Sequence, residues 1–262
     1  MKEANDYFLE TENKILEEIL NGKYQGTHAI YNWVVDALCT TKILSDEFNK
    51  SEISILYSEA LFRFRTATLI ANRGYYSDGL MILRSVYEIV KAINAIQNGI
   101  IDAKSYLTGF TETDERLTGE ELIEKSEAHA KKMDNLVNNF DDKDIPQIHK
   151  ENLKIFKDFL YKSVHKSSFN IILRTFNFYK NSIKNPFEFL PDPQLYELYF
   201  NSFCFIMLMY MRCLLKSKYI RDSLDKYLFK DRIDTLEEDF LNMNSSYQND
   251  IIKYIQIKYN YN

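Results

Sequence analysis

The stretch ALFRFRTATLIANRGYYSDGLMILRSVYEIVKAINA, residues 60–95, decides the fold of this chain. Its apolar residues follow the helical period on both sides of Gly74, which predicts two helices joined by a short turn. Short connections between long helices make them antiparallel neighbours. We expect the first helix to span residues 51–73, with Ser51 as its N-cap and Gly74 as its C′ residue, and the second to end near Gly99.

The same periodicity covers most of the 262-residue chain, which has only 7 Gly and 4 Pro. This scarcity argues against turn-rich all-β folds. We therefore predict an all-α protein, a single helical domain over residues 1–262. Its antiparallel bundle would occupy about 28–184, with additional N-terminal helices and a helical C-terminal extension at about 191–262. A separate C-terminal domain is the alternative. Further helices are expected at about 3–20, 28–48, 120–140, 147–164 and 194–216.

Composition excludes several classes of site. The net charge of −5 gives no global attraction to nucleic acid. The chain lacks the glycine-rich phosphate loops, the HExxH zinc motif and the GxSxG nucleophile elbow. Its four histidines do not pair at helical spacing. We therefore expect no metal and no cofactor.

The cysteines and the longest apolar run indicate the compartment. Cys39, Cys204 and Cys213 are odd in number and form no CxxC pair, which is typical of free thiols in a reducing compartment. The uncharged run 198–211 is too short to span a bilayer and is better explained as a buried core helix. A cytoplasmic protein without membrane association is predicted.

The helix after Gly74 carries the most informative pattern. Its apolar residues cover nearly the whole circumference, which is typical of a core helix. Arg84, Glu88 and Lys91 nevertheless share a stripe only about 60° wide, and the first two are spaced to form an ion pair. Charges on a buried helix need partners. The stripe is either a narrow strip of solvent exposure or the wall of a polar cleft between helices, and the sequence does not separate these alternatives.

Two other regions supply candidate partners for this stripe. Arg65 lies on the preceding helix, where a solvated face is the simpler explanation. Further along, residues 161–166 place His165 between lysines, and a neutral imidazole there could act as general acid or base. A surface or structural histidine is the alternative. The candidate ligand-binding residues are Arg65, Lys91, Tyr161, Lys162 and Ser163, and the candidate catalytic residues are Arg84, Glu88 and His165.

Residues 60–95 resemble the helix–turn–helix of HEPN-like proteins, in an uncharacterised bacterial branch with an Arg-Ser-x-x-Glu helix. The matching parts are Gly74-Tyr75, the stretch from Arg84 to Glu88, and Lys91, with Ser163 and His165 as a loose counterpart of a downstream motif. The resemblance implies an antiparallel helical bundle that forms a homodimer. It also implies a role in bacterial defence or toxin–antitoxin systems, whose active members are metal-independent ribonucleases.

The active members carry an Arg followed four to six residues later by His, and no histidine of this chain is preceded in that way. Cleavage would instead need Arg84 to stabilise developing phosphate charge, His165 to move a proton and Glu88 to orient them. Our leading hypothesis is a HEPN-like protein that binds RNA or a nucleotide in this cleft, with or without cleavage. The alternative is a non-catalytic interaction or regulatory module that docks a partner protein, in which Arg84 and Glu88 form a structural ion pair.

Overall fold

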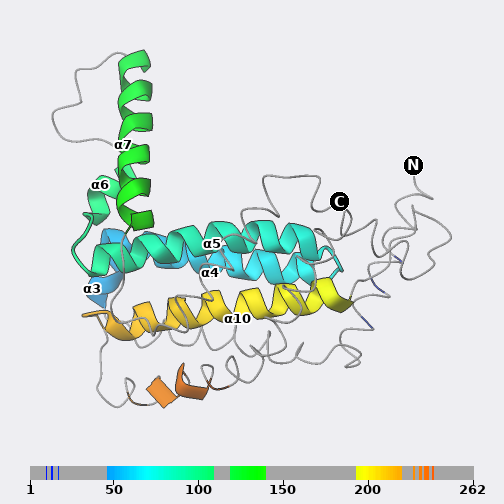
Figure 1. Ribbon diagram of the computed structural model, residues 1–262. Coiled ribbons are helices and arrows are strands. Elements are labelled where there is room, and N and C mark those ends of the chain that lie inside the picture. The colour runs from blue at the N-terminus through cyan, green and yellow to red at the C-terminus, as the bar shows by residue number, and fades with distance from the viewer. Residues whose placement is uncertain are drawn as a thin grey trace.

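The computed structural model describes residues 46–108, 119–139 and 193–219, and single positions among residues 10–17 and 227–238. Within this part every regular element is a helix, so the all-α prediction is confirmed there (Figure 1). The helices predicted at 3–20 and 147–164, and most of 28–48, lie outside the described residues. The described helices are α3 (Asp46–Asn49), α4 (Glu52–Ala71), α5 (Tyr76–Gln97), α6 (Ala103–Thr108), α7 (Gly119–Asn139) and α10 (Pro193–Lys216).

The turn between α4 and α5 has the geometry that the sequence predicts. The amide of Tyr75 donates to the carbonyl of Ile70 at 3.3 Å, and that of Gly74 donates to Ala71 at 2.8 Å. This pair of bonds is the Schellman motif, with Gly74 at C′ and a φ of 86°. Glycine adopts a positive φ without steric cost. The same motif ends α5, where Gly99 has a φ of 71°.

The start of α4 differs in one detail. Ser51 precedes the helix with extended φ and ψ of −92° and 145°, as an N-cap residue should, but its side chain makes no cap hydrogen bond. Its hydroxyl instead donates to the carbonyl of Phe48 at 2.6 Å. The side chain thus ties α4 back to the end of α3.

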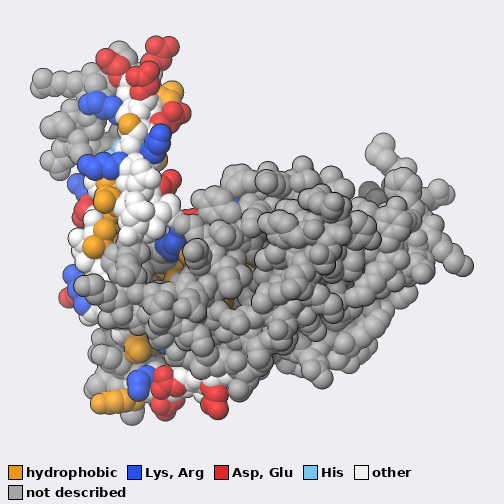
Figure 2. Space-filling model, in the orientation of Figure 1, with side chains coloured by type: hydrophobic (Ala, Val, Ile, Leu, Met, Phe, Trp, Pro, Cys, Tyr) orange, Lys and Arg blue, Asp and Glu red, His pale blue; other side chains and the backbone are white. Residues whose placement is uncertain are grey.

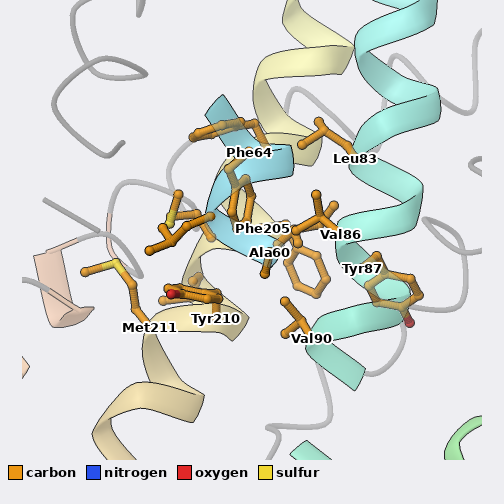
Figure 3. Packing of buried hydrophobic residues seen from close by; sticks show 14 of the residues in the cluster. Ala60, Phe64, Leu83, Val86, Tyr87, Val90, Phe205, Tyr210 and Met211 are labelled. Atoms are coloured by element: carbon orange, nitrogen blue, oxygen red, sulfur yellow. The ribbon is translucent and has the colours of Figure 1, made fainter. Parts of the chain in front are cut away.

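The core lies between the three long helices α4, α5 and α10, which run side by side (Figure 1). As predicted, α5 is a core helix: it contacts α4 along its length, α10 on another side and α7 near its C-terminal end. Figure 3 shows side chains of all three long helices meeting around Phe64. The Phe64 ring packs edge-on against Phe203 and Tyr210, at centroid distances of 5.2 and 5.8 Å. Such aromatic contacts add to the stabilisation from area burial.

Close approach of α5 and α10 depends on a glycine. A Cβ added at Gly79 would lie 2.8 Å from Cε2 of Tyr199. The Tyr199 ring is fully buried, so it has little room to move away. Gly79 therefore lets the Tyr199 ring lie directly on the backbone of α5.

The described side chains of the apolar run 198–211 in α10 are buried, except for the half-buried Met209, which confirms the prediction of a core helix. Cys204 and Cys213 are buried free thiols in this helix. Cys39 lies outside the described residues. In the part of the chain that the structure describes, no helix combines the length and apolarity needed to cross a bilayer.

A polar side chain links the ends of the three long helices. Nε2 of Gln97, at the end of α5, donates to the hydroxyl of Tyr57 on α4 and to the carbonyl of Cys213 on α10, each at 2.8 Å. Burial raises the pKa of Tyr57 well above its usual value. Gln97 thus satisfies two buried acceptors on two different helices.

Helices α6 and α7 lie at the end of the bundle where α5 finishes, and α7 rises away from the three long helices (Figure 1). A second, small apolar cluster packs α7 against the end of α5. Its buried members are Ala92, Ala95, Ile101 and Val137. The small side chains on α5 allow the last turns of α7 to approach closely.

Candidate functional site

The charged stripe of α5 lies partly buried, between the two alternatives that the sequence left open. Arg84, Glu88 and Lys91 are all of intermediate exposure. The side chain of Lys91 is only 12% exposed and that of Glu88 34%. The three charged side chains are therefore neither fully buried nor fully exposed. Because partial burial removes water from a charge, each of them needs a compensating contact.

Lys91 is held by three groups. Its Nζ lies 2.6 Å from Oε2 of Glu88 and donates to Oδ1 of Asn138, on α7, at 2.7 Å. It also lies over the Tyr87 ring, 4.9 Å from the centroid. A cation stacked on an aromatic face and paired with a carboxylate is well compensated for its burial.

The ion pair of Glu88 differs from the expected one. In the described residues its carboxylate pairs with Lys91, at i,i+3, and not with Arg84 at i,i+4. The same ammonium donates to Asn138, so the Glu88 carboxylate, the Lys91 ammonium and the α7 side-chain amide form one connected group. The second carboxylate oxygen, Oε1, is inaccessible to solvent and accepts no hydrogen bond from a described residue. Arg84 also makes an interaction, so it is not a free cation.

Tyr106 on α6 completes the polar surroundings of this site. Burial raises its pKa, and the carboxylates of Asp134 and Glu88 raise it further. The phenol is therefore protonated at neutral pH. It contributes a neutral donor and acceptor beside two carboxylates, and its ring packs against the apolar seat of α7.

The position of α7 is set by a further hydrogen bond to α6. Nε2 of His129 lies 2.9 Å from the carbonyl oxygen of Ser105, to which it must donate. The amide of Ser105 in turn donates to Oδ2 of Asp102 at 2.8 Å, an N-terminal cap of α6. The histidine thus joins α7 to α6.

Beside this junction, one face of α7 and Ile100, which follows α5, line an open groove of about 610 Å³. Its floor is largely apolar and its rim carries lysine and asparagine side chains. Figure 2 shows α7 as an exposed arm carrying mixed basic, acidic and apolar side chains. The residues that line the groove are Ile100, Ala128, Lys131, Lys132, Asn135, Leu136 and Asn139.

The structure describes four of the eight predicted site residues. It brings Glu88 and Lys91 into direct contact and places Arg84 on the same helix one turn away. Arg65 is exposed on α4. The other four lie outside the described residues: Tyr161, Lys162, Ser163 and His165.

Three contributors to the site were not predicted from the sequence. Tyr87 was assigned only to the apolar face of α5, and Tyr106 and Asn138 were not singled out. The position of Tyr87, four residues before Lys91, is a usable signal, because an i,i+4 pair shares one helix face. Asn138 had no such signal, since it lies 47 residues from Lys91 in the chain.

The site offers binding groups in place of a nucleophile or a metal centre. Its polar atoms are a guanidinium, a lysine–carboxylate pair, a neutral phenol and an amide. In the described ranges no group of His, Cys, Asp and Glu side chains could hold a metal ion. Comparisons of the chain with protein-family models, curated proteins and solved structures found no match.

Proposed function

We propose that the chain is a cytoplasmic, HEPN-like protein of a bacterial defence or toxin–antitoxin system that binds RNA or a nucleotide at the charged stripe of α5. The observation that carries the proposal is that half-buried Arg84, Glu88 and Lys91 lie together on the partly exposed side of α5, whose other side is buried in the core. Holding charges out of bulk water costs free energy. Such groups are retained where they bind something or stabilise a defined contact.

Arg84 is the group that would contact phosphate. A guanidinium offers a planar fork of donors that matches phosphate oxygens, and partial burial strengthens each of these bonds. Lys91 is already neutralised by Glu88 at 2.6 Å, so it would contribute less net attraction. The phenol of Tyr106 and the Tyr87 ring lie beside the stripe. The Tyr106 phenol supplies a hydrogen-bonding group of the kind that bases use, whereas the Tyr87 ring is buried and its face is taken by the Lys91 ammonium.

Binding is tested with the full chain, a fluorescent single-stranded RNA and, separately, ATP. Arg84→Ala should weaken binding about 10-fold or more, the effect of losing one charge-assisted contact. Arg73→Ala, which removes an exposed arginine beside the turn between α4 and α5, should change it less than about 2-fold. Affinity should fall with salt. Absence of binding to either probe, or equal effects of the two substitutions, contradicts the proposal.

Cleavage is a separate part of the proposal. His165 would take the proton from a ribose 2′-hydroxyl as its oxygen bonds to the adjacent phosphorus, and Arg84 would stabilise the charge that develops on the phosphate oxygens. The bond from phosphorus to the 5′-oxygen breaks, which leaves a 2′,3′-cyclic phosphate, and the protonated His165 returns its proton to the leaving 5′-oxygen. We expect RNA cleavage that persists in EDTA and is abolished by His165→Ala. If RNA binds but remains intact under all conditions, the binding proposal stands and the ribonuclease proposal is wrong.

A non-catalytic interaction module is the second candidate, and a specific contact favours it. Lys91 is engaged with Glu88 and with Asn138 of α7, so part of the stripe serves to fix the α7 arm. In that function α7 and its groove would present a surface to a partner protein. Lys91→Ala would then lower the melting temperature without any change in RNA affinity, whereas the binding function predicts that Arg84→Ala weakens RNA binding with little change in melting temperature.

A further inference from the structure

One side of α7 lines a groove that no other described helix covers. The α7 residues that line it fall within about 140° of one another around the helix, at 100° per residue. The opposite side carries Met133 and Val137, which pack in the small cluster between α7 and α5. We call the groove, defined by its seven lining residues, the α7 groove: Ile100, Ala128, Lys131, Lys132, Asn135, Leu136 and Asn139.

The floor of the α7 groove is apolar and in contact with solvent. Leu136 is 39% exposed and Ile100 is 41% exposed. The Ala128 methyl group and the aliphatic stems of the two lysines extend this apolar surface. Covering it with a partner is favourable, because apolar area is then removed from water. An apolar floor with a polar rim is the usual composition of a protein–protein contact.

The charged residues that line the α7 groove are both lysines. Lys131 and Lys132 are exposed on its rim. Neither is ion-paired with a residue in the described ranges. They differ in this from Lys91, which Glu88 neutralises at 2.6 Å. The two ammonium groups are therefore available to a partner.

Carboxylates close to the α7 groove lie on other sides. Asp102 accepts a hydrogen bond from the amide of Ser105 at 2.8 Å, in the first turn of α6. Asp134 lies toward Tyr106, whose pKa is raised by burial and raised further by the Asp134 carboxylate. The four glutamates of α7 belong to residues 119–127, before the first α7 residue that lines the groove. The surface that complements the groove is therefore acidic.

A helix is the form of partner that this surface accommodates. The α7 residues that line the groove extend over about 17 Å, or about three helical turns. The α7 backbone is hydrogen-bonded within its own helix. An extended chain would therefore find few partners for its backbone groups, chiefly the side-chain amides of Asn135 and Asn139. A helix satisfies its own backbone and needs only side-chain contacts.

Nucleic acid fits the α7 groove less well. Single-stranded RNA is bound by stacking of its bases on aromatic rings, and none of the described lining residues is aromatic. Two lysines also neutralise few phosphates, and phosphate contacts dominate the affinity for nucleic acid. A protein helix makes use of the apolar floor and the charged rim together.

We propose that the α7 groove binds a helix of a partner protein, whose apolar side chains cover Ile100 and Leu136 and whose carboxylates pair with Lys131 and Lys132. The proposal rests on the interaction-module function, the second candidate above, and adds the chemistry of its partner. Apolar contact supplies affinity, and the carboxylates select among partners.

The charge preference is tested by fluorescence anisotropy of the full chain with labelled synthetic helical peptides. The peptides share leucines along one face, and their bordering positions are all glutamate, all glutamine or all lysine. The glutamate peptide should bind about 10-fold or more tightly than the lysine peptide. Lys131→Glu combined with Lys132→Glu should reverse this order, which unfolding cannot do. Arg73→Glu, an exposed charge reversal beside the turn between α4 and α5, should preserve it.

The apolar contribution is tested with the same peptides. Leu136→Ala should weaken binding of the glutamate peptide about 5-fold or more, because it removes part of the floor. Ile123→Ala is the matched control and should leave binding unchanged, since Ile123 is a 61% exposed apolar residue of α7 that does not line the groove. Circular dichroism should show equal helix content in these variants.

The proposal is overturned if the wild type shows no saturable binding of the glutamate peptide, or binds the glutamate and lysine peptides equally. It is also overturned if the double charge reversal leaves the preference unchanged. Loss of RNA binding in that variant would assign the groove to nucleic acid instead. The interaction-module function is judged separately, by the melting temperature and RNA affinity of Lys91→Ala, so it can stand when the glutamate peptide fails to bind.

Discussion

The ammonium of Lys91 lies 2.7 Å from Oδ1 of Asn138, so the second half of α5 is hydrogen-bonded to the last turn of α7. The same ammonium neutralises Glu88 and stacks on Tyr87. One cation thus joins the charged stripe of the core helix to the arm that rises from it. Any ligand or partner that competes for Lys91 also acts on the attachment of α7.

Lys91→Met should loosen this attachment. It removes the partners of Glu88 and Asn138 at once, and because Glu88 is partly exposed the expected loss is roughly 1–3 kcal/mol of unfolding free energy, below that of a fully buried pair. Hydrogen exchange should show reduced protection of α7 amides before those of α4 or α10. Lys132→Met, on the exposed side of α7, should change stability by less than about 0.5 kcal/mol. Unaltered α7 protection in Lys91→Met would contradict the role assigned to the lysine.

Gln97→Ala should destabilise the whole bundle. The substitution leaves the Tyr57 hydroxyl and the Cys213 carbonyl without the amide that binds both at 2.8 Å. Unsatisfied buried groups cost roughly 1–3 kcal/mol. Denaturant unfolding measures the loss, and Asn98→Ala is the control, since the Asn98 side chain donates only to Asn94, one turn earlier in α5. Equal stabilities of the two variants would show that Gln97 does not join the helices.

Alkaline pH should unfold the chain through its buried tyrosines. Burial raises the pKa values of Tyr57, Tyr106 and Tyr210 above those of unfolded tyrosine. Above about pH 10 the unfolded chain therefore loses protons that the folded chain keeps, and the unfolding free energy falls as pH rises. Below that pH these tyrosines are protonated in both states, so they do not change the unfolding free energy with pH. Absorbance near 295 nm should show buried tyrosines ionising together with loss of helix; their ionisation in a fully helical chain would be inconsistent with this burial.

Gly79→Ala should be destabilising although alanine favours helices. The new Cβ would lie 2.8 Å from the Tyr199 ring, which is fully buried. Overpacking of this kind costs roughly 1–3 kcal/mol and exceeds the gain in helix propensity. In the Tyr199→Leu background the same substitution should cost less, because the ring is gone. The melting temperatures of the wild type, the two single variants and the double variant give the coupling between the substitutions. Zero coupling would show that contact with the Tyr199 ring does not cause the destabilisation.

Local patterns were sufficient to predict the helices of the described chain. Glycine scarcity, apolar periodicity and the Gly74 turn predicted α4, α5, α7 and α10 close to their observed bounds. Apolar residues around nearly the whole circumference of α5 predicted that this helix packs in the core. These properties depend on interactions between residues a few positions apart, or on the average surroundings of one helix.

The site was predicted only in part, because its contacts cross between helices. The sequence placed Arg84, Glu88 and Lys91 on one face of α5, since helical spacing alone decides that. Spacing allows Glu88 to pair with Arg84 or with Lys91, and only the first pair was expected; the structure pairs Glu88 with Lys91, which also contacts Asn138 of α7. The sequence also could not predict that Tyr106 lies near Glu88, or that Gly79 lies against Tyr199. Periodicity determines which side of a helix is apolar or charged, whereas the packing of distant helices decides what each of those sides meets.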